Sequence, residues 1–243
     1  MVLRFGETIF IYGVVVMSDD KKKVSGLFMC IGVLFVTCLL LSNLVAGKMW
    51  AVTSDITLPA AVILFPVTYI LGDVFTEVYG FRKARMIIWL GFGCTALAVL
   101  VYLLTIALPH PGFFENQGAY EAVLGTTPRV AAASFAGYLF GEFSNSIILS
   151  KLKVVTNGKH LWVRTILSTI VGEGFDSVIF ITISFWGTME NSEIFKMILF
   201  QYLFKVAYEV LFTPLTYFVV GTIKKAEGID TFDKGIKYNI IKG

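Results

Sequence analysis

Six long stretches with almost no charged side chains recur along the chain, and they constrain its fold more than any other feature. A helix crosses the hydrocarbon core of a bilayer, which is about 30 Å thick, with about 20 residues. Residues 26–46, 56–72 and 86–108 contain no charged side chain, and residues 130–150, 165–189 and 197–223 contain one, two and two. We therefore predict an all-α membrane protein with six transmembrane helices.

The composition indicates contact with lipid. Hydrophobic residues make up 56% of the chain and charged residues 15%, whereas the surface of a soluble domain is roughly 25–35% charged. The net charge is only +3 and the basic residues form short clusters between apolar stretches, so we expect no nucleic-acid partner. Cys30, Cys38 and Cys94 lie inside apolar stretches without CxxC spacing, which indicates packing thiols rather than disulfides or metal ligands.

Lysine and arginine residues cluster in every second connection between the apolar stretches. The clusters lie at 21–23, 82–85, 151–164 and 224–225, and the opposite connections contain only Lys48, Arg129 and Lys196. Because basic residues accumulate in short cytoplasmic loops, we predict that both termini are cytoplasmic and that the protein is a multi-pass protein of the inner (cytoplasmic) membrane.

The predicted domain organisation follows from this topology. A cytoplasmic segment 1–23, without a cleaved signal, precedes a transmembrane domain 24–223 and a cytoplasmic tail 224–243, and we assign neither end a role in the core. The outer connection 109–129 is expected to form a partly ordered loop or lid. Pro59, Pro66 and Pro214 lie inside predicted spans, where we expect local kinks or breaks.

Acidic side chains inside, or directly after, three of the six stretches point to function. A carboxylate at the centre of a membrane helix costs about 2.5–3.5 kcal/mol, so each one needs a partner, water or a role. Each acid shares one face of its helix with a second polar residue three or four positions away. The pairs are Asp73 with Glu77, Glu142 with Asn145, and Glu173 with Asp176.

A glycine precedes the first acid of each pair, at Gly72, Gly141 and Gly172. Glycine permits close approach of membrane helices, so the three acidic faces are predicted to converge on one interior chamber. Carboxylates there would accept hydrogen bonds from a ligand rich in N–H groups. This interpretation predicts a carrier for a small polar molecule.

A purely structural interpretation of the same acids stays open. They would then pair with cations such as Lys48, Arg129 and Lys205, and we expect Lys205 and Glu209 to pair in this way. The cytoplasmic Arg82 and Arg85 are the cations that would hold Asp73 and Glu77 at the membrane interface. Asn43 and Lys48 form another polar cluster at the outer end of the first stretch, although a lysine near a helix end also snorkels to the interface.

No motif indicates catalysis. The sequence contains neither HExxH nor GxSxG, and His110 and His160 lie outside the six stretches, so we expect no enzyme activity, no catalytic residue and no metal. A Walker P-loop is also absent. We expect no cofactor, and transport would depend on an ion gradient, on a partner or on trapping of the product.

The stretch 65–80, FPVTYILGDVFTEVYG, followed by Arg82 and Arg85, resembles the signature of the queuosine precursor transporter family. The similarity continues in the same order over roughly residues 24–223. It includes Asn43, Lys48, Gly141, Glu142, Asn145, the segment 150–153, Arg164, Ser168, Thr169, Gly172, Glu173, Asp176 and Ser177.

The resemblance implies uptake of 7-deazaguanines for tRNA modification: queuine, or its cyano or aminomethyl precursor. It also implies a six-helix fold similar to the substrate-binding subunits of energy-coupling-factor vitamin transporters. The residues then expected to contact substrate are Asn43, Lys48, Asp73, Glu77, Glu142, Asn145, Glu173, Asp176 and Ser177. The alternatives are a binding subunit that needs an energising partner and a membrane enzyme or receptor for the same ligand, and a homo-oligomer stays open.

Overall fold

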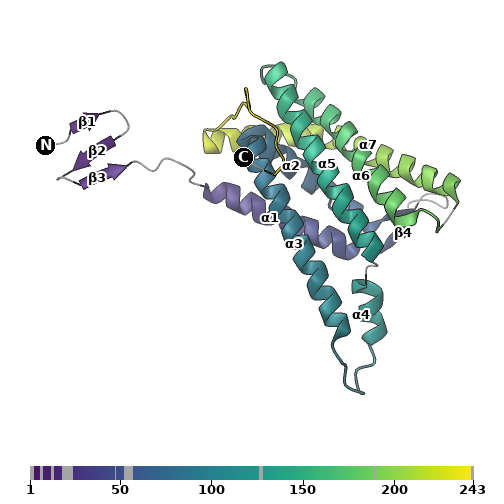
Figure 1. The fold of residues 1–243 in the computed structure, drawn as a ribbon. Coiled ribbons are helices and arrows are strands. Elements are labelled where there is room, and N and C mark those ends of the chain that lie inside the picture. The colour runs from purple at the N-terminus through teal and green to yellow at the C-terminus, as the bar shows by residue number, and fades with distance from the viewer. Residues whose placement is uncertain are drawn as a thin grey trace.

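The main body of the protein is a bundle of long helices (Figure 1). The computed structural model describes residues 3–5, 8–11, 14–17, 24–46, 48–51, 57–125, 128–188 and 190–241. The helices are α1 (Gly26–Val45), α2 (Phe65–Tyr79), α3 (Phe81–Ala107), α4 (Gln117–Leu124), α5 (Pro128–Val155), α6 (Leu161–Phe185) and α7 (Asn191–Glu227), and a 3₁₀ turn, η1, covers Ala60–Ile63.

The described residues also include five short strands. The strands β1 (Leu3–Phe5), β2 (Thr8–Ile11) and β3 (Val14–Met17) form an antiparallel sheet in that order, and β4 (Met49–Ala51) pairs with β5 (Thr57–Pro59). The prediction of an all-α membrane protein therefore holds for the bundle, and the strands are an addition to it.

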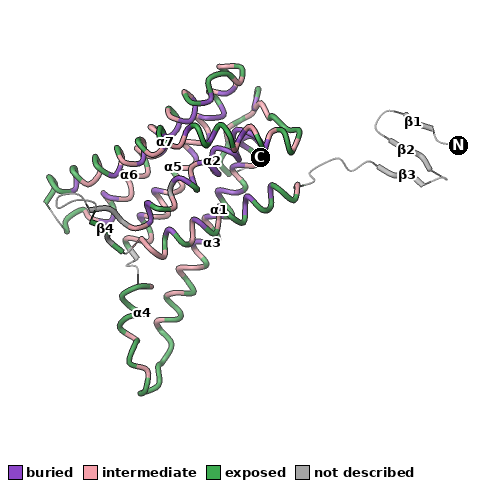
Figure 2. Tube along the Cα trace, turned by 180° about the vertical axis from the view of Figure 1, so that it is seen from behind, coloured by how far each residue is buried: buried purple, intermediate pink, exposed green. Residues whose placement is uncertain are grey.

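Among the described residues, four helices are long and apolar enough to cross a membrane: α1, α3, α6 and α7. Their outward faces expose large apolar side chains, for example Leu97, Leu104, Leu211 and Phe218, and Figure 2 shows these helices largely exposed along their outer sides. Such faces suit contact with lipid, since a soluble protein rarely exposes large contiguous apolar patches.

The second predicted span differs from the observed structure at its start. Ile56 lies outside the described residues, and the chain then runs through β5 and η1 before α2 begins at Phe65 and continues to Tyr79. Both prolines of this stretch lie at element ends, which is consistent with the lack of an N–H donor in proline. Pro59 is the last residue of β5. Pro66 occupies the first turn of α2, where the backbone N–H has no partner within the helix. At Pro214, by contrast, α7 continues without a break.

The outer connection 109–129 contains the short helix α4, which projects beside the end of α3 away from the bundle (Figure 1). Gln117 Nε2 donates to Ile106 O at 3.1 Å and so ties the start of α4 to α3. The expected partly ordered loop is thus a helical hairpin with an exposed second arm.

Helices α5 and α6 approach each other closely through glycines. A Cβ atom on Gly172 would lie 2.9 Å from Gly141 O and 2.8 Å from Asn145 Cβ. A Cβ atom on Gly141 would lie 2.9 Å from Asp176 Cβ. The predicted role of these two glycines in close helix packing is therefore confirmed, and the contact brings the acids beside them together.

Residues 228–241, which we call the C-terminal strap, pack back onto the bundle, contrary to the expectation that the tail has no role in the core. Asp233 Oδ2 accepts hydrogen bonds from Phe81 N at 2.7 Å and from Ser150 Oγ at 2.6 Å. The α2–α3 corner is Gly80 at φ +82°, where a Cβ atom would lie 2.7 Å from Thr231 Cγ2. The strap therefore fits against a corner that requires glycine.

Candidate functional site

Four helices bring five carboxylates and one ammonium group into the interior of the bundle. The carboxylates come from all four helices, and the ammonium group comes from α7. The residues are Asp73 on α2, Glu142 on α5, Glu173 and Asp176 on α6, and Lys205 and Glu209 on α7. Acids of three predicted spans thus lie near one another, although of these acids only Glu142 lines the cavity described below.

Lys205 is held by the acids of α6. Its Nζ lies 2.6 Å from Glu173 Oε2 and also donates to Asp176 Oδ2. The expected pair of Lys205 with Glu209 is therefore wrong, because the lysine extends across the helix interface to two acids instead of along its own helix to one. Glu209 is 2% exposed, and its Oε1 has no hydrogen-bond partner among the described residues.

Glu142 is the acid of this cluster that faces open space. No hydrogen bond or ion pair joins its carboxylate to another residue in the described part of the chain, although it interacts electrostatically with Glu173 and Asp176. A cavity of about 10 Å³ lies beside it, lined by Phe35, Gly72, Phe75, Thr76, Ala84, Ile87, Ile88 and Ser146. That volume is about what one water molecule needs, so a flat base would enter only after the helices separate.

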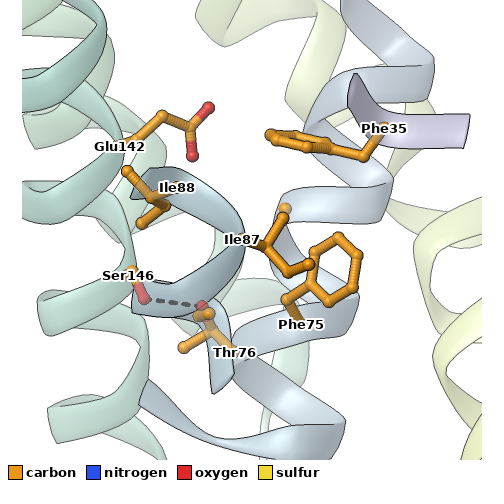
Figure 3. A pocket seen from close by; sticks show the side chains of 9 residues that line it. Phe35, Phe75, Thr76, Ile87, Ile88, Glu142 and Ser146 are labelled. Atoms are coloured by element: carbon orange, nitrogen blue, oxygen red, sulfur yellow. Dashed lines mark hydrogen bonds between the residues drawn. The ribbon is translucent and has the colours of Figure 1, made fainter. Parts of the chain in front are cut away.

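The walls of this cavity combine aromatic rings with hydroxyl groups (Figure 3). Phe35 from α1 and Glu142 from α5 lie across the cavity from each other, and Phe75 stands on the α2 side. Thr76 Oγ1 and Ser146 Oγ are 2.8 Å apart at the other end. The arrangement offers a planar ligand apolar faces, one acceptor for N–H groups and two hydroxyls that donate or accept.

Asp73 lies deeper in the bundle than Glu142. It is 1% exposed, Asn145 Nδ2 donates to its Oδ1 at 3.3 Å, and its Oδ2 has no hydrogen-bond partner among the described residues. Its electrostatic neighbours are Glu209 on α7, Glu77 on α2 and Glu142 on α5. The predicted residues Asp73 and Asn145 therefore contact each other.

The structure places Glu77 in an ion-pair network of its own. Its Oε1 lies 2.7 Å from Arg164 Nη2, 2.8 Å from Lys224 Nζ and 3.6 Å from Lys153 Nζ, and the carboxylate is fully buried. Arg82 and Arg85, the partners expected from the sequence, are not among these ion pairs. Arg85 instead donates to Asn239 O of the strap at 2.6 Å.

The remaining predicted residues lie apart from the acid cluster or have no visible contact with it. Asn43 is exposed at the end of α1 and donates to Leu39 O at 3.1 Å. It lines a second cavity, of about 40 Å³, with Leu39, Thr95, Ser134, Phe135 and Tyr138. Lys48 is exposed beyond α1. Ser177 is fully buried on α6, and its Oγ has no hydrogen-bond partner in the described part of the chain.

Sequence reasoning missed most of the cavity wall, including its aromatic and hydroxyl residues Phe35, Phe75, Thr76 and Ser146. Ser146 and Thr76 had a detectable signal, because Ser146 lies four residues after Glu142 and Thr76 three after Asp73, which places each on the same helix face as the acid. Phe35 had a weaker signal, since the residues around it in α1 are mostly apolar and the polar residue that shares its buried face, Ser42, lies seven positions later. Within the described residues, no group of three or more His, Cys, Asp or Glu side chains is placed to hold a metal ion.

Long apolar helices around a polar, acid-rich interior define a multi-pass membrane protein with the properties of a small-molecule transporter. The profile of the putative vitamin uptake transporter family matches residues 59–219. The chain belongs to this family, and the curated relatives that it matches are named queuosine precursor transporters.

Three curated proteins show this relationship. The chain is 28% identical over 157 residues to the probable queuosine precursor transporter of Bacillus subtilis (strain 168), covering 64% of this chain and 68% of that protein. It is 25% identical to the queuosine precursor transporter of Escherichia coli (strain K12), covering 61% and 66%, and 26% identical to the probable queuosine precursor transporter of Haemophilus influenzae Rd, covering 65% and 67%. No solved structure matches the chain. The names describe transport, a non-enzymatic activity, as predicted.

The matched stretch spans about two thirds of the length of each of these relatives. The stretch matched by the family profile includes the acid cluster, because Asp73, Glu142, Glu173 and Glu209 all lie between residues 59 and 219. The family relationship and the interior site therefore concern the same part of the chain.

Proposed function

We propose that the protein imports a 7-deazaguanine precursor of queuosine across the bacterial cytoplasmic membrane. The single observation that carries the proposal is the carboxylate of Glu142, which has no ion pair or hydrogen bond within the described residues and faces a cavity with the rings of Phe35 and Phe75 on its walls. A deazaguanine has ring and exocyclic N–H donors along one edge, which suit a carboxylate acceptor. Its flat ring suits stacking against the phenylalanines.

Other groups around the cavity complement the remaining edges of such a base. Thr76 and Ser146 are two hydroxyls able to donate to the ring carbonyl, and Asn145 lies one residue before Ser146 on α5. Glu173 and Asp176 are electrostatic neighbours of Glu142, and Lys205 neutralises part of their negative charge. We infer that this ion pair opens when a base enters and that Asp176 then meets the cationic arm of an aminomethyl precursor.

The proposed topology has six spans with both termini in the cytoplasm. Helices α2 and α5 would join the four long apolar helices as the remaining spans. α5 has 28 residues, ample for a bilayer of about 30 Å at 1.5 Å per residue. α2 has only 15 residues, and η1 and β5 would complete its passage inside the protein, where irregular backbone at membrane depth is tolerated.

Uptake by cells unable to make deazaguanines tests the proposal. Cells carrying the wild-type chain should convert supplied 7-cyano-7-deazaguanine into queuosine in tRNA, and Glu142→Gln should reduce uptake at least tenfold, because a primary amide replaces one acceptor oxygen with a donor. Glu173→Gln should reduce uptake less, since Lys205 would still form its ion pair with Asp176. Glu193→Gln, which changes an exposed acid of α7, is the matched control. Wild-type uptake by Glu142→Gln would refute the proposed pocket.

A further inference from the structure

The interior cluster contains more carboxylates than cations. Of the five carboxylates, Glu173 and Asp176 share Lys205, and none of Asp73, Glu142 and Glu209 forms an ion pair within the described residues. Burying an uncompensated carboxylate in a membrane protein is costly, and such acids either find a partner or bind a proton. Glu142 faces the cavity where a ligand would supply donors, but Asp73 and Glu209 do not line that cavity.

Asp73 and Glu209 share three properties that distinguish them from the substrate-facing acid. Both are almost fully buried, at 1% and 2% exposure. Each keeps one carboxylate oxygen without a hydrogen-bond partner in the described part of the chain, Oδ2 of Asp73 and Oε1 of Glu209. They come from α2 and α7, two helices in direct contact, and Glu209 is the strongest charged neighbour of Asp73.

The surroundings of this pair contain further acids, and among the described residues neither acid forms an ion pair with a cation. Asp73 faces Glu77 from its own helix and Glu142 and Asn145 from α5. Glu209 faces Glu173 and Thr165 from α6, and Lys205, one turn away on α7, is held by Glu173 and Asp176. Three basic residues surround Glu77 instead. A proton on either acid would remove one negative charge and turn an oxygen without a partner into a donor.

We propose that Asp73 and Glu209 form a proton-binding pair that couples substrate import to the proton gradient. The proton would come from water on the outer side, reside on the pair while the base is bound, and leave to the cytoplasm, with no bond to the substrate made or broken. This inference rests on the proposed function, since it concerns how the same carrier is driven.

Purified protein in liposomes tests the inference with 7-cyano-7-deazaguanine as the probe. Counterflow, the exchange of labelled for unlabelled base at equal pH, measures transport without any driving force. Accumulation is then measured with the outside one pH unit more acidic, with an inward Na⁺ gradient, and with neither. For one proton per base, the pH gradient should drive up to about tenfold accumulation, which a protonophore should abolish, and the Na⁺ gradient should drive none.

Glu209→Gln isolates the coupling role, because glutamine mimics the protonated acid and releases no proton. We expect counterflow within about twofold of wild type, with accumulation lost, and partial accumulation in Glu209→Asp. Retained counterflow shows that the variant is folded. Glu193→Gln, at an exposed acid on the same helix that pairs with Lys196 at 2.7 Å, should accumulate like wild type.

Three results would overturn the coupling inference while leaving the proposed function intact. They are wild-type accumulation by Glu209→Gln, accumulation driven by Na⁺ instead of protons, and wild-type counterflow without accumulation under any gradient. Absence of counterflow in the wild-type protein would instead refute the proposed function itself.

Discussion

Arg164 Nη2 lies 2.7 Å from Glu77 Oε1, and the two side chains are 1% and 0% exposed. Around this buried pair, Lys224 and Lys153 bring the ends of α7 and α5 to the same carboxylate, and both lysines also contact Asp230 of the strap. One acid at the end of α2 therefore joins α5, α6 and α7, at the end of the bundle opposite α4 (Figure 1). In the proposed orientation this is the cytoplasmic end, so the network would hold that end closed.

Replacing Glu77 should destabilise the protein strongly. Glu77→Gln leaves three cations around a neutral side chain, and removal of one partner of a buried ion pair costs about 3–5 kcal/mol. We expect a clearly lower midpoint of thermal unfolding in detergent, measured by intrinsic fluorescence.

The matched control is Glu193→Gln, which breaks the ion pair with Lys196 between side chains that are 55% and 60% exposed. Exposed pairs contribute about 0–1 kcal/mol, so this midpoint should hardly move. Equal midpoints for the two variants would show that Glu77 does not hold the helix ends together.

Close packing of α5 on α6 gives a second prediction. Gly172→Ala places a methyl group 2.9 Å from Gly141 O and 2.8 Å from Asn145 Cβ, and such overpacking costs about 1–3 kcal/mol. Because the strain falls beside Asn145, uptake should decrease together with the unfolding midpoint. Both quantities can be measured on the same purified protein.

Gly93→Ala is the control for this substitution, since a Cβ atom there meets nothing within 4 Å. Alanine is the better helix former by roughly 0.8–1.0 kcal/mol, so this variant should be as stable as wild type or more stable. A Gly172→Ala protein as stable as Gly93→Ala would contradict the close contact.

The sequence predicted the bundle and the acidic interior because both depend on strong local signals. Long apolar stretches with at most two charged residues mark α1, α3, α6 and α7, and acids with a second polar residue three or four positions away mark the inward faces of α2, α5 and α6. Gly141 and Gly172 were recognised for the same reason, as small residues beside those acids. Each signal depends on residues close together in the chain.

What could not be predicted depends on contacts between distant residues. Lys205 pairs with Glu173 and Asp176, and Glu77 pairs with Arg164, in each case across an interface between two helices. The spacing of residues in the sequence does not predict which partners meet across such an interface. Phe35 is hard to assign to an inward position because its helix is mostly apolar and carries no charged residue. The strap has ordinary polar composition, and only its fit to Gly80 and Ser150 shows that it belongs to the core.

Asp233 should be the main anchor of the strap. Asp233→Ala removes the acceptor for Phe81 N and Ser150 Oγ, and leaving a buried donor without a partner costs about 1–3 kcal/mol. We expect faster proteolysis and faster hydrogen exchange at residues 228–241, while the exchange of α3 beyond its first turn stays unchanged. Unchanged exchange of the strap would mean that its other contacts are sufficient.

Binding of the strap should also weaken in acid, through Asp230. Burial alone would raise the pKa of this carboxyl group, but hydrogen bonds from Lys153 and Lys224 outweigh it and lower the pKa below its usual value, which is about 3.9. A lowered pKa in the folded state contributes stability that is complete above the pKa of the unfolded state and is lost as the pH falls through the pKa of the folded state.

Anisotropy of a fluorophore attached within the strap should therefore stay constant from neutral pH to about pH 5 and fall below about pH 4. In Asp230→Asn, which has no charge to lose, the acid step should be smaller, and an identical step in both proteins would assign the effect to another group.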